Sequence, residues 1–332
     1  MLFKMPVVKI SGVSVPRAIL GHLPFVGESY QGSAKNRECV ERFSKVENTV
    51  SILSRAVQNY GITVLSAVPA TEGELASLYL EAVHETVLET GIDIALIPCF
   101  RILLTVEGKP LNDYRRWLTY YGIEKRIVGQ VILEKYLNDP VLQCREGWKE
   151  RFLTTLKHYA PYKTEIEKIS INREEMRRAI ESLKDFVAFA ELGSETDFLV
   201  MIDRMDLLGE LVDWLQGSFG YRVILASHHA GLTIPTLEKS DIKFHGYVTP
   251  INKRGVMMFP TQELAVEGIR NARKPIIAIK PLAGGRLQPQ PALEYVYGDL
   301  NADTCMIGVS SKEELDQDFT TALRLMRAHK NL

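Results

Sequence analysis

The chain has 332 residues, enough for one large α/β domain or two ordinary ones, and 46% of them are hydrophobic, enough to fill a sizeable core. Its 40 basic and 41 acidic residues give a formal charge of −1, without the positive excess that binding to a phosphate backbone generally needs. The sequence contains no apolar run of the roughly 18 residues needed to cross a bilayer, and its start lacks the apolar core and cleavage site of a signal peptide. We therefore expect a cytoplasmic protein that binds neither nucleic acid nor membrane.

The four cysteines are widely spaced and include no C-x-x-C pair. This spacing predicts neither a disulfide framework nor a zinc ribbon. We expect Cys39, Cys144 and Cys305 to be buried apolar thiols. Cys99 differs because it stands near the end of a predicted strand.

The first half of the chain alternates short apolar runs with amphipathic stretches. Strands are predicted at 17–22, 62–68 and 92–100, with helices around 36–60 and 72–90. Residues 104–190 contain no convincing strand but several charged, aromatic-bearing helical stretches, so we interpret them as a helical insertion after the third strand. The insertion could be a lid over a barrel mouth or a packing extension, and the sequence leaves both open.

The second half of the chain continues the alternation, which indicates βαβ units and a parallel sheet. Candidate strands are the apolar runs at 197–202, 221–227, 243–248, 275–280 and 303–309. The sequence SSKEEL, from residue 310, has a glutamate three residues after a serine, a capping box that opens the last amphipathic helix. Five strands and the earlier three make eight, so we predict one (β/α)8 TIM barrel, with residues 1–332 as a single domain.

Two motifs near the end of the chain carry a resemblance to a known family. The segments KPIIAIKPLAGGRLQPQPALEY and TCMIGVSSKEELDQDF together resemble the last two βα units of the aldo-keto reductases. VKISGVSVPRAILGHLPF is similar to that family's opening hairpin and first strand, and TDFLVMIDRMD and VILASHHA to its fourth and fifth strands. The resemblance implies an aldo-keto reductase-like barrel, an NAD(P) cofactor and oxidoreductase activity.

The turns after the seventh and eighth strands are candidate phosphate sites. In barrels of this kind these turns present free backbone N–H groups and a helix N-terminus to an anion. In the first turn, Ala283, Gly284 and Gly285 allow close approach of the backbone. In the second turn, donors and charge come from Gly308, Ser310, Ser311 and Lys312. Simple turn formation and helix capping remain alternatives for both turns.

The resemblance also implies a catalytic tetrad of aspartate, tyrosine, lysine and histidine, and the sequence does not carry it. In the family the tyrosine gives a proton to the carbonyl oxygen as hydride arrives, and the lysine lowers the pKa of that tyrosine. Here the second strand ends at Ser66, and the third ends at Cys99 and Arg101. The fourth predicted strand places Ile202 or Asp203 where the histidine is expected, while Ser227 alone is retained among the family's nicotinamide contacts.

Polar residues at the predicted carboxyl ends of the strands should converge on one cavity. They are His22, Ser66, Cys99, Arg101, Asp203, Arg204, His228, His229, Thr249, Lys280 and Ser310. Three of them, His22, Asp203 and His228, have the ligand types of a divalent-metal or proton-transfer site. We expect a polar cluster without a metal, and a divalent-metal site is the alternative.

Lys280 precedes Pro281, and its position in the seventh strand points its side chain into the barrel. A lysine in an apolar barrel can lose its charge and act as a Schiff-base nucleophile, or it can snorkel to the mouth or pair with Asp203. Cys99 could be a thiolate beside Arg101, although no base for it is evident.

Three functions compete. The first is a divergent oxidoreductase that binds NAD(P) or another phosphate-bearing ligand at the two turns. The second is a lyase, aldolase or isomerase for a phosphate substrate that uses Lys280, Asp203 and His228. The third is a non-catalytic ligand-binding barrel. All three imply a small-molecule ligand, and all are compatible with a homo-oligomer.

Overall fold

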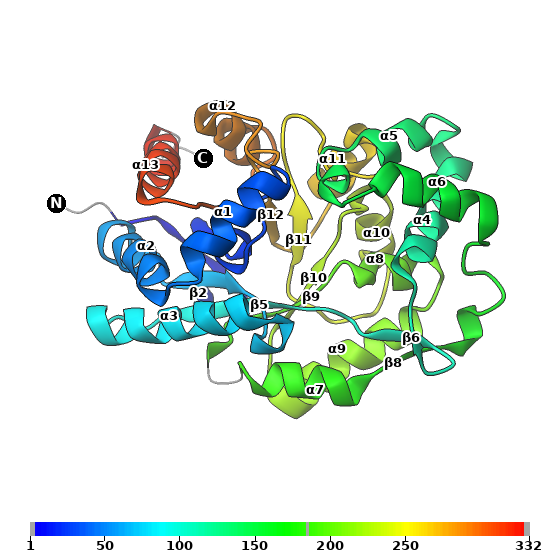
Figure 1. Cartoon of the computed structure of the whole chain (residues 1–332), viewed down its shortest axis with the longest axis horizontal. Coiled ribbons are helices and arrows are strands. Elements are labelled where there is room, and N and C mark those ends of the chain that lie inside the picture. Colours follow the sequence, from blue (N-terminus) through cyan, green and yellow to red (C-terminus); the bar gives the residue numbers. More distant parts are fainter. Residues whose placement is uncertain (1–3, 184–185, 329–332) are drawn as a thin grey trace.

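Eight parallel strands form the centre of the computed structural model, which describes residues 4–183 and 186–328. The strands are β3 (Ala18–Gly21), β4 (Val64–Ala67), β5 (Ala95–Phe100), β9 (Ala190–Leu192), β10 (Val223–Ala226), β11 (Tyr247–Pro250), β12 (Ile276–Ile279) and β13 (Thr304–Gly308). They close into a barrel in the order β10-β11-β12-β13-β3-β4-β5-β9 (Figure 1). The predicted (β/α)8 barrel is confirmed.

Apolar side chains fill the interior of the barrel. One buried cluster takes a residue or two from each strand or its approach: Ile19, Val64, Ile97, Phe189, Ile224, Ala226, Val248, Ile277 and Met306. A hairpin precedes the first barrel strand, formed by β1 (Val7–Ile10) and β2 (Val13–Pro16). Its Ile10 and Val15 belong to the same cluster, so the hairpin closes the amino-terminal end of the barrel.

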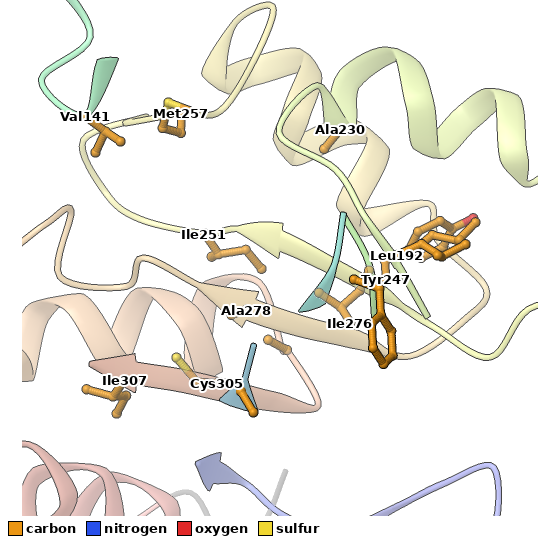
Figure 2. Close-up of a cluster of buried hydrophobic side chains, with 14 of the residues drawn as sticks. Val141, Leu192, Ala230, Tyr247, Ile251, Met257, Ile276, Ala278, Cys305 and Ile307 are labelled. Carbon is orange, nitrogen blue, oxygen red and sulfur yellow. The ribbon is translucent and has the colours of Figure 1, made fainter. Parts of the chain in front are cut away.

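Helices surround the strands. They include α1 (Ser33–Phe43), α2 (Val46–Tyr60), α3 (Glu74–Thr90), α7 (Arg173–Glu181), α8 (Glu195–Met201), α9 (Met205–Phe219), α10 (Ala230–Leu237), α11 (Gln262–Arg270), α12 (Pro289–Glu294) and α13 (Lys312–Ala328). A second core cluster contains Tyr247, Ala278 and Cys305, which Figure 2 shows on neighbouring strands. All four cysteines are free thiols; Cys39 and Cys305 are buried as expected, and Cys144 is half-buried. None of the described helices is both long and apolar enough to span a membrane.

The segment between β5 and β9 follows the third barrel strand, as predicted. It contains α4 (Asp113–Val128), α5 (Ile132–Asn138) and α6 (Trp148–His158), which Figure 1 shows gathered beside α10 and α11. It also holds a three-stranded sheet of β6 (Leu104–Val106), β7 (Lys109–Pro110) and β8 (Ile169–Ile171). The expectation that residues 104–190 contain no strand is therefore wrong.

The fourth barrel strand is not where the sequence placed it. Residues 197–201, which begin the predicted strand, lie in α8, and the true fourth strand is β9. Phe198, Leu199 and Val200 are all buried, so this helix has no polar face that would reveal its period. Asp203 consequently follows a helix and is exposed to solvent, instead of ending a barrel strand.

Buried hydrogen bonds fasten the inserted helices to the barrel. His229 Nδ1 lies 2.6 Å from a carboxylate oxygen of Glu124 on α4, and both side chains are fully buried. The hydroxyl of Tyr136 on α5 donates to the other oxygen of Glu124 at 2.5 Å. Beyond α5, Asp139 accepts the N–H of Met257 at 2.7 Å. The inserted helices thus pack on the side of the barrel formed by α10 and the loop after β11.

Candidate active site

A pocket of about 430 Å³ opens at the carboxyl ends of the barrel strands, the face on which barrel enzymes carry their active sites. Nine of the residues predicted for the cavity or its turns line it: His22, Ser66, Cys99, His228, Lys280, Gly284, Gly285, Gly308 and Ser310. Nine others are not among its lining residues: Arg101, Asp203, Arg204, Ser227, His229, Thr249, Ala283, Ser311 and Lys312. None of the described residues between 101 and 190 lines the pocket.

Lys280 occupies the centre of the candidate site. Its Nζ lies 3.1 Å from His228 Nε2 and 4.8 Å from the centre of the Tyr30 ring. Burial lowers the pKa of Lys280 to about 8, although the neighbouring Glu191 carboxyl opposes this shift. Burial, followed by the charge of Lys280, lowers the pKa of His228 well below its usual range. The imidazole is therefore neutral, and its Nε2 accepts a hydrogen bond from the Lys280 ammonium. The predicted alternative of a pair between Lys280 and Asp203 is wrong.

Glu191 and Cys99 lie beside each other on β9 and β5 and share a hydrogen bond. Burial raises the pKa of Glu191 to about 7, while the Cys99 hydrogen bond and the charge of Lys280 act in the opposite direction. Burial and the Glu191 charge raise the pKa of the Cys99 thiol well above its usual range. Arg101 is largely exposed and lies 3.9 Å from Glu72. Cys99 is therefore a thiol hydrogen-bonded to Glu191, not a thiolate beside Arg101.

His22 and Ser66 form a second polar pair in the pocket, with Nδ1 of the histidine 2.7 Å from the serine Oγ. Burial and the charge of Lys280 lower the pKa of His22 to about 4, so this imidazole is also neutral. Asp203 lies outside the pocket, and the predicted metal ligands His22, Asp203 and His228 do not come together. Across the described ranges, no group of three His, Cys, Asp or Glu side chains could hold a metal ion.

Asp197 on α8 is a buried residue that positions part of the site, and the sequence analysis did not identify it. Its carboxylate accepts the hydroxyls of Ser227 and Thr233, each at 2.6 Å. It also accepts the N–H groups of His228 and His229 at 2.8 and 3.3 Å. Asp197 thereby fixes the turn from β10 into α10 and with it the backbone of His228. Ser227 is engaged in this contact, so its predicted role as a cofactor ligand has no support from the geometry.

The turn after β12 is built to present backbone donors. Gly284 and Gly285 have φ values of +67° and +75°, which favour glycine. A Cβ on Gly284 would lie 2.5 Å from Nη1 of Arg286, and one on Gly285 would lie 2.8 Å from Nε2 of Gln31. Within the described residues, neither glycine N–H has a hydrogen-bond acceptor, and both residues line the pocket. These two donors suit an anion.

The turn after β13 differs because the donors of Ser310 are already satisfied. The N–H and Oγ of Ser310 both donate to the carboxylate of Glu314, at 2.6 and 2.9 Å. The Oγ of Ser311 accepts the Glu314 N–H at 3.2 Å, so the predicted capping box opens α13. A carboxylate thus stands where the Ser310 donors would meet a phosphate. The predicted anion site therefore stays a prediction for both turns, and in this arrangement Ser310 has no free donor to offer it.

Comparisons with known proteins agree with this architecture. No family model and no curated protein matches the sequence. Two solved structures from Pseudomonas aeruginosa, both assigned provisionally to the aldo-keto reductases, match the chain with TM-scores of 0.56 and 0.55 at 13% and 12% identity. Each match covers 98% of this chain, and 98% and 97% of the respective structures. The chain therefore has the fold of the aldo-keto reductases.

Proposed function

We propose that the protein is an enzyme that acts on a small carbonyl compound, with Lys280 as the proton donor to the carbonyl oxygen. The observation that carries this proposal is the buried Lys280 ammonium, which lies in the pocket 3.1 Å from the neutral His228 imidazole. With a pKa of about 8, Lys280 is mostly protonated at pH 7. A donor whose pKa lies close to the working pH is well suited to general acid catalysis.

Neighbouring groups support Lys280 in this role. As negative charge develops on the carbonyl oxygen, an N–H of Lys280 donates to it, while the neutral imidazole of His228 holds the amine in place. The charge of Glu191 favours the protonated amine, which keeps the proton donor loaded near neutral pH. Cys99 remains a thiol and serves as the hydrogen-bond partner of Glu191.

Reduction of the carbonyl, or its reverse, is the reaction that we propose first. A nicotinamide dinucleotide would supply the hydride when bound. The N–H groups of Gly284 and Gly285 would hold a phosphate of such a ligand, because both glycines line the pocket and their N–H groups have no acceptor among the described residues. Glu314 leaves no equivalent donor at Ser310.

Schiff-base chemistry is the second candidate, favoured by the pKa of Lys280. A pKa of about 8 leaves roughly one amine in ten uncharged at pH 7, and an uncharged amine can attack a carbonyl carbon. This is the lyase, aldolase or isomerase alternative with Lys280 and His228 as its residues. Asp203 has no part in it, because it lies outside the pocket.

Binding and turnover measurements test the proposal. NADH and NADPH should raise the melting temperature of the wild type, and a Gly285→Asp variant should lose that effect because a carboxylate would face the phosphate. Carbonyl turnover should fall about 10²- to 10⁴-fold in Lys280→Met. Lys280→Arg keeps the charge but should also be slow, since arginine does not release its proton. Lys239→Met, which removes an exposed lysine outside the pocket, is the matched control and should retain full activity.

Ordinary aromatic and aliphatic aldehydes should be reduced far more slowly than by typical aldo-keto reductases, because the tetrad's tyrosine is missing. NADPH absorbance with a panel of aldehydes measures this rate. Borohydride treatment with substrate, followed by mass spectrometry, identifies the second candidate through a stable adduct on Lys280. Carbonyl turnover that survives Lys280→Met would overturn both reactions, and a protein that neither binds a dinucleotide nor turns over a carbonyl compound would be a non-catalytic barrel.

A further inference from the structure

Asp318 is a buried carboxyl group on the pocket wall, and no partner for it lies among the described residues. It lies in α13, is 4% exposed, and lines the same pocket as Lys280. Across the described ranges, no side chain or backbone group forms a hydrogen bond or ion pair with its carboxyl. Asp316, two residues earlier, shows the contrast, because Arg55 and Tyr60 both donate to it. A buried carboxyl without a donor is costly, and a ligand that supplied one would remove that cost.

The surroundings of Asp318 are acidic. Glu314 lies one helical turn earlier and lines the pocket together with Gln317 and Glu28. Lys35 also lines the pocket, but its Nζ pairs with Glu38 at 3.1 Å. Arg42, on the same helix as Lys35, donates to the carbonyl oxygen of Ser310. Lys35 and Arg42 are therefore engaged by Glu38 and Ser310. Glu314 accepts from Ser310 through one oxygen, Oε2, and within the described residues Asp318 adds an unpaired carboxyl to the same wall.

We propose that Asp318, Glu314 and Gln317 form a subsite for a cationic nitrogen group, an ammonium or a guanidinium, on the ligand; we call it the cation subsite. Charge-assisted N–H···O bonds to carboxylates are about twice as strong as neutral ones, and a planar guanidinium can contact two oxygens at once. The proposal stands independently of the chemistry at Lys280. Together with the proposed function, the cation subsite implies a substrate with a carbonyl group at one end and a cationic group at the other. This description of the substrate rests on the proposed function.

Titration of Asp318 supplies a separate signature of binding. Burial, followed by the charge of Glu314, raises the pKa of Asp318 to about 7 in the free protein. The other titratable groups that face this end are Cys305 from β13, Cys39 and Lys35 from α1, and Glu28. A bound cation favours the ionised carboxyl and lowers its pKa. Binding should therefore release a proton near pH 6–7 and strengthen as pH rises through about 7.

Isothermal titration with three probes of similar size tests the cation subsite. Butylguanidinium is positive, pentanamide is neutral and pentanoate is negative. The wild type should bind butylguanidinium at least about tenfold more tightly than either other probe. In Asp318→Asn this preference should fall about tenfold or more, and the proton release, read from buffers of different ionisation enthalpy, should disappear. Glu313→Gln is the matched control, because it removes one charge from an exposed position in the first turn of the same helix. It should change affinity less than twofold.

Several results would overturn this inference. They are equal affinity for the three probes, a preference for pentanoate, no binding of butylguanidinium at 10 mM, or unchanged affinity in Asp318→Asn. If Asp318→Asn does not fold, Glu314→Gln must show the same loss of preference. Lys280→Met separates the two proposals: it should lower carbonyl turnover about 10²- to 10⁴-fold and leave butylguanidinium binding intact. Loss of turnover with intact cation binding supports both, whereas turnover that survives Lys280→Met refutes only the proposed function.

Discussion

Replacing Asp197 by alanine should destabilise the protein severely, because one carboxylate satisfies four donors in a site that water does not reach. The variant leaves the N–H groups of His228 and His229 without an acceptor, at about 1–3 kcal/mol each. It also removes the hydrogen bonds from Ser227 and Thr233, worth about 1 kcal/mol each. We therefore expect a loss of about 4–8 kcal/mol in the free energy of unfolding.

Asparagine at the same position should cost at least about 2 kcal/mol less than alanine. Its amide oxygen can accept the two N–H groups, and the two hydroxyls can rotate to accept from its NH2 group. Urea unfolding at constant m value measures both losses. Asp206→Ala is the control, because that side chain is 55% exposed and its ion pair with Arg204 lies at the surface, so the change should cost below about 1 kcal/mol. An Asp197→Ala variant within about 1.5 kcal/mol of wild type would refute the account of this turn.

Three further predictions concern protonation and backbone shape, and all are measured by urea unfolding. The pKa of Lys280 is about 8 in the folded protein and 10.5 in the unfolded chain, so between these two pH values the unfolded chain binds more protons. The Lys280 contribution should therefore raise the stability of the wild type by up to about 3 kcal/mol from pH 8 to 10.5, and Lys280→Met should lose this contribution. For Glu191 the folded pKa of about 7 exceeds the unfolded 4.5, so this group should lower stability by a similar amount from pH 4.5 to 7. Asp318, with a folded pKa of about 7, acts in the same direction, so the fall should be smaller in Glu191→Gln than in the wild type by about the Glu191 share. Gly284→Ala should cost at least about 1 kcal/mol more than Gly91→Ala, because both have nearly the same φ but only Gly284 has atoms where the Cβ would stand; equal costs would contradict this.

Most of the barrel could be predicted because its strands are short β-branched runs separated by amphipathic helices. The run at 275–280 and the run at 303–309 correspond closely to β12 and β13. The fourth strand could not be found this way. β9 has only three residues, and one of them is Glu191, whereas the more apolar run at 197–202 looked like a better strand. Periodicity cannot separate a fully buried helix from a buried strand.

The misassigned fourth strand also changed which residues were predicted for the candidate site. It placed Asp203 at the barrel mouth and left out Glu191, which lines the pocket. The run FVAFAEL before Gly193 was the available signal, since a short apolar stretch ending at a glycine is typical of a buried strand. Lys280 and His228 were correctly placed, because each directly follows or closely follows a strand that was recognised. The role of Glu314 could not be predicted, since a capping glutamate looks the same in sequence whether or not it blocks a phosphate site.

The closure of the barrel has a consequence for synthesis in the cell. The first barrel strand, β3, hydrogen-bonds with the last, β13, so Leu20 cannot pair with Ile307 until β13 has been synthesised. At about 5–20 residues per second, a ribosome needs roughly 15–60 s to make the intervening chain. Throughout that time β3 keeps an unpaired edge, the kind of edge that promotes aggregation. A nascent chain stalled before β13 should therefore depend on chaperones, and the final strand should convert an aggregation-prone open sheet into a protected cylinder.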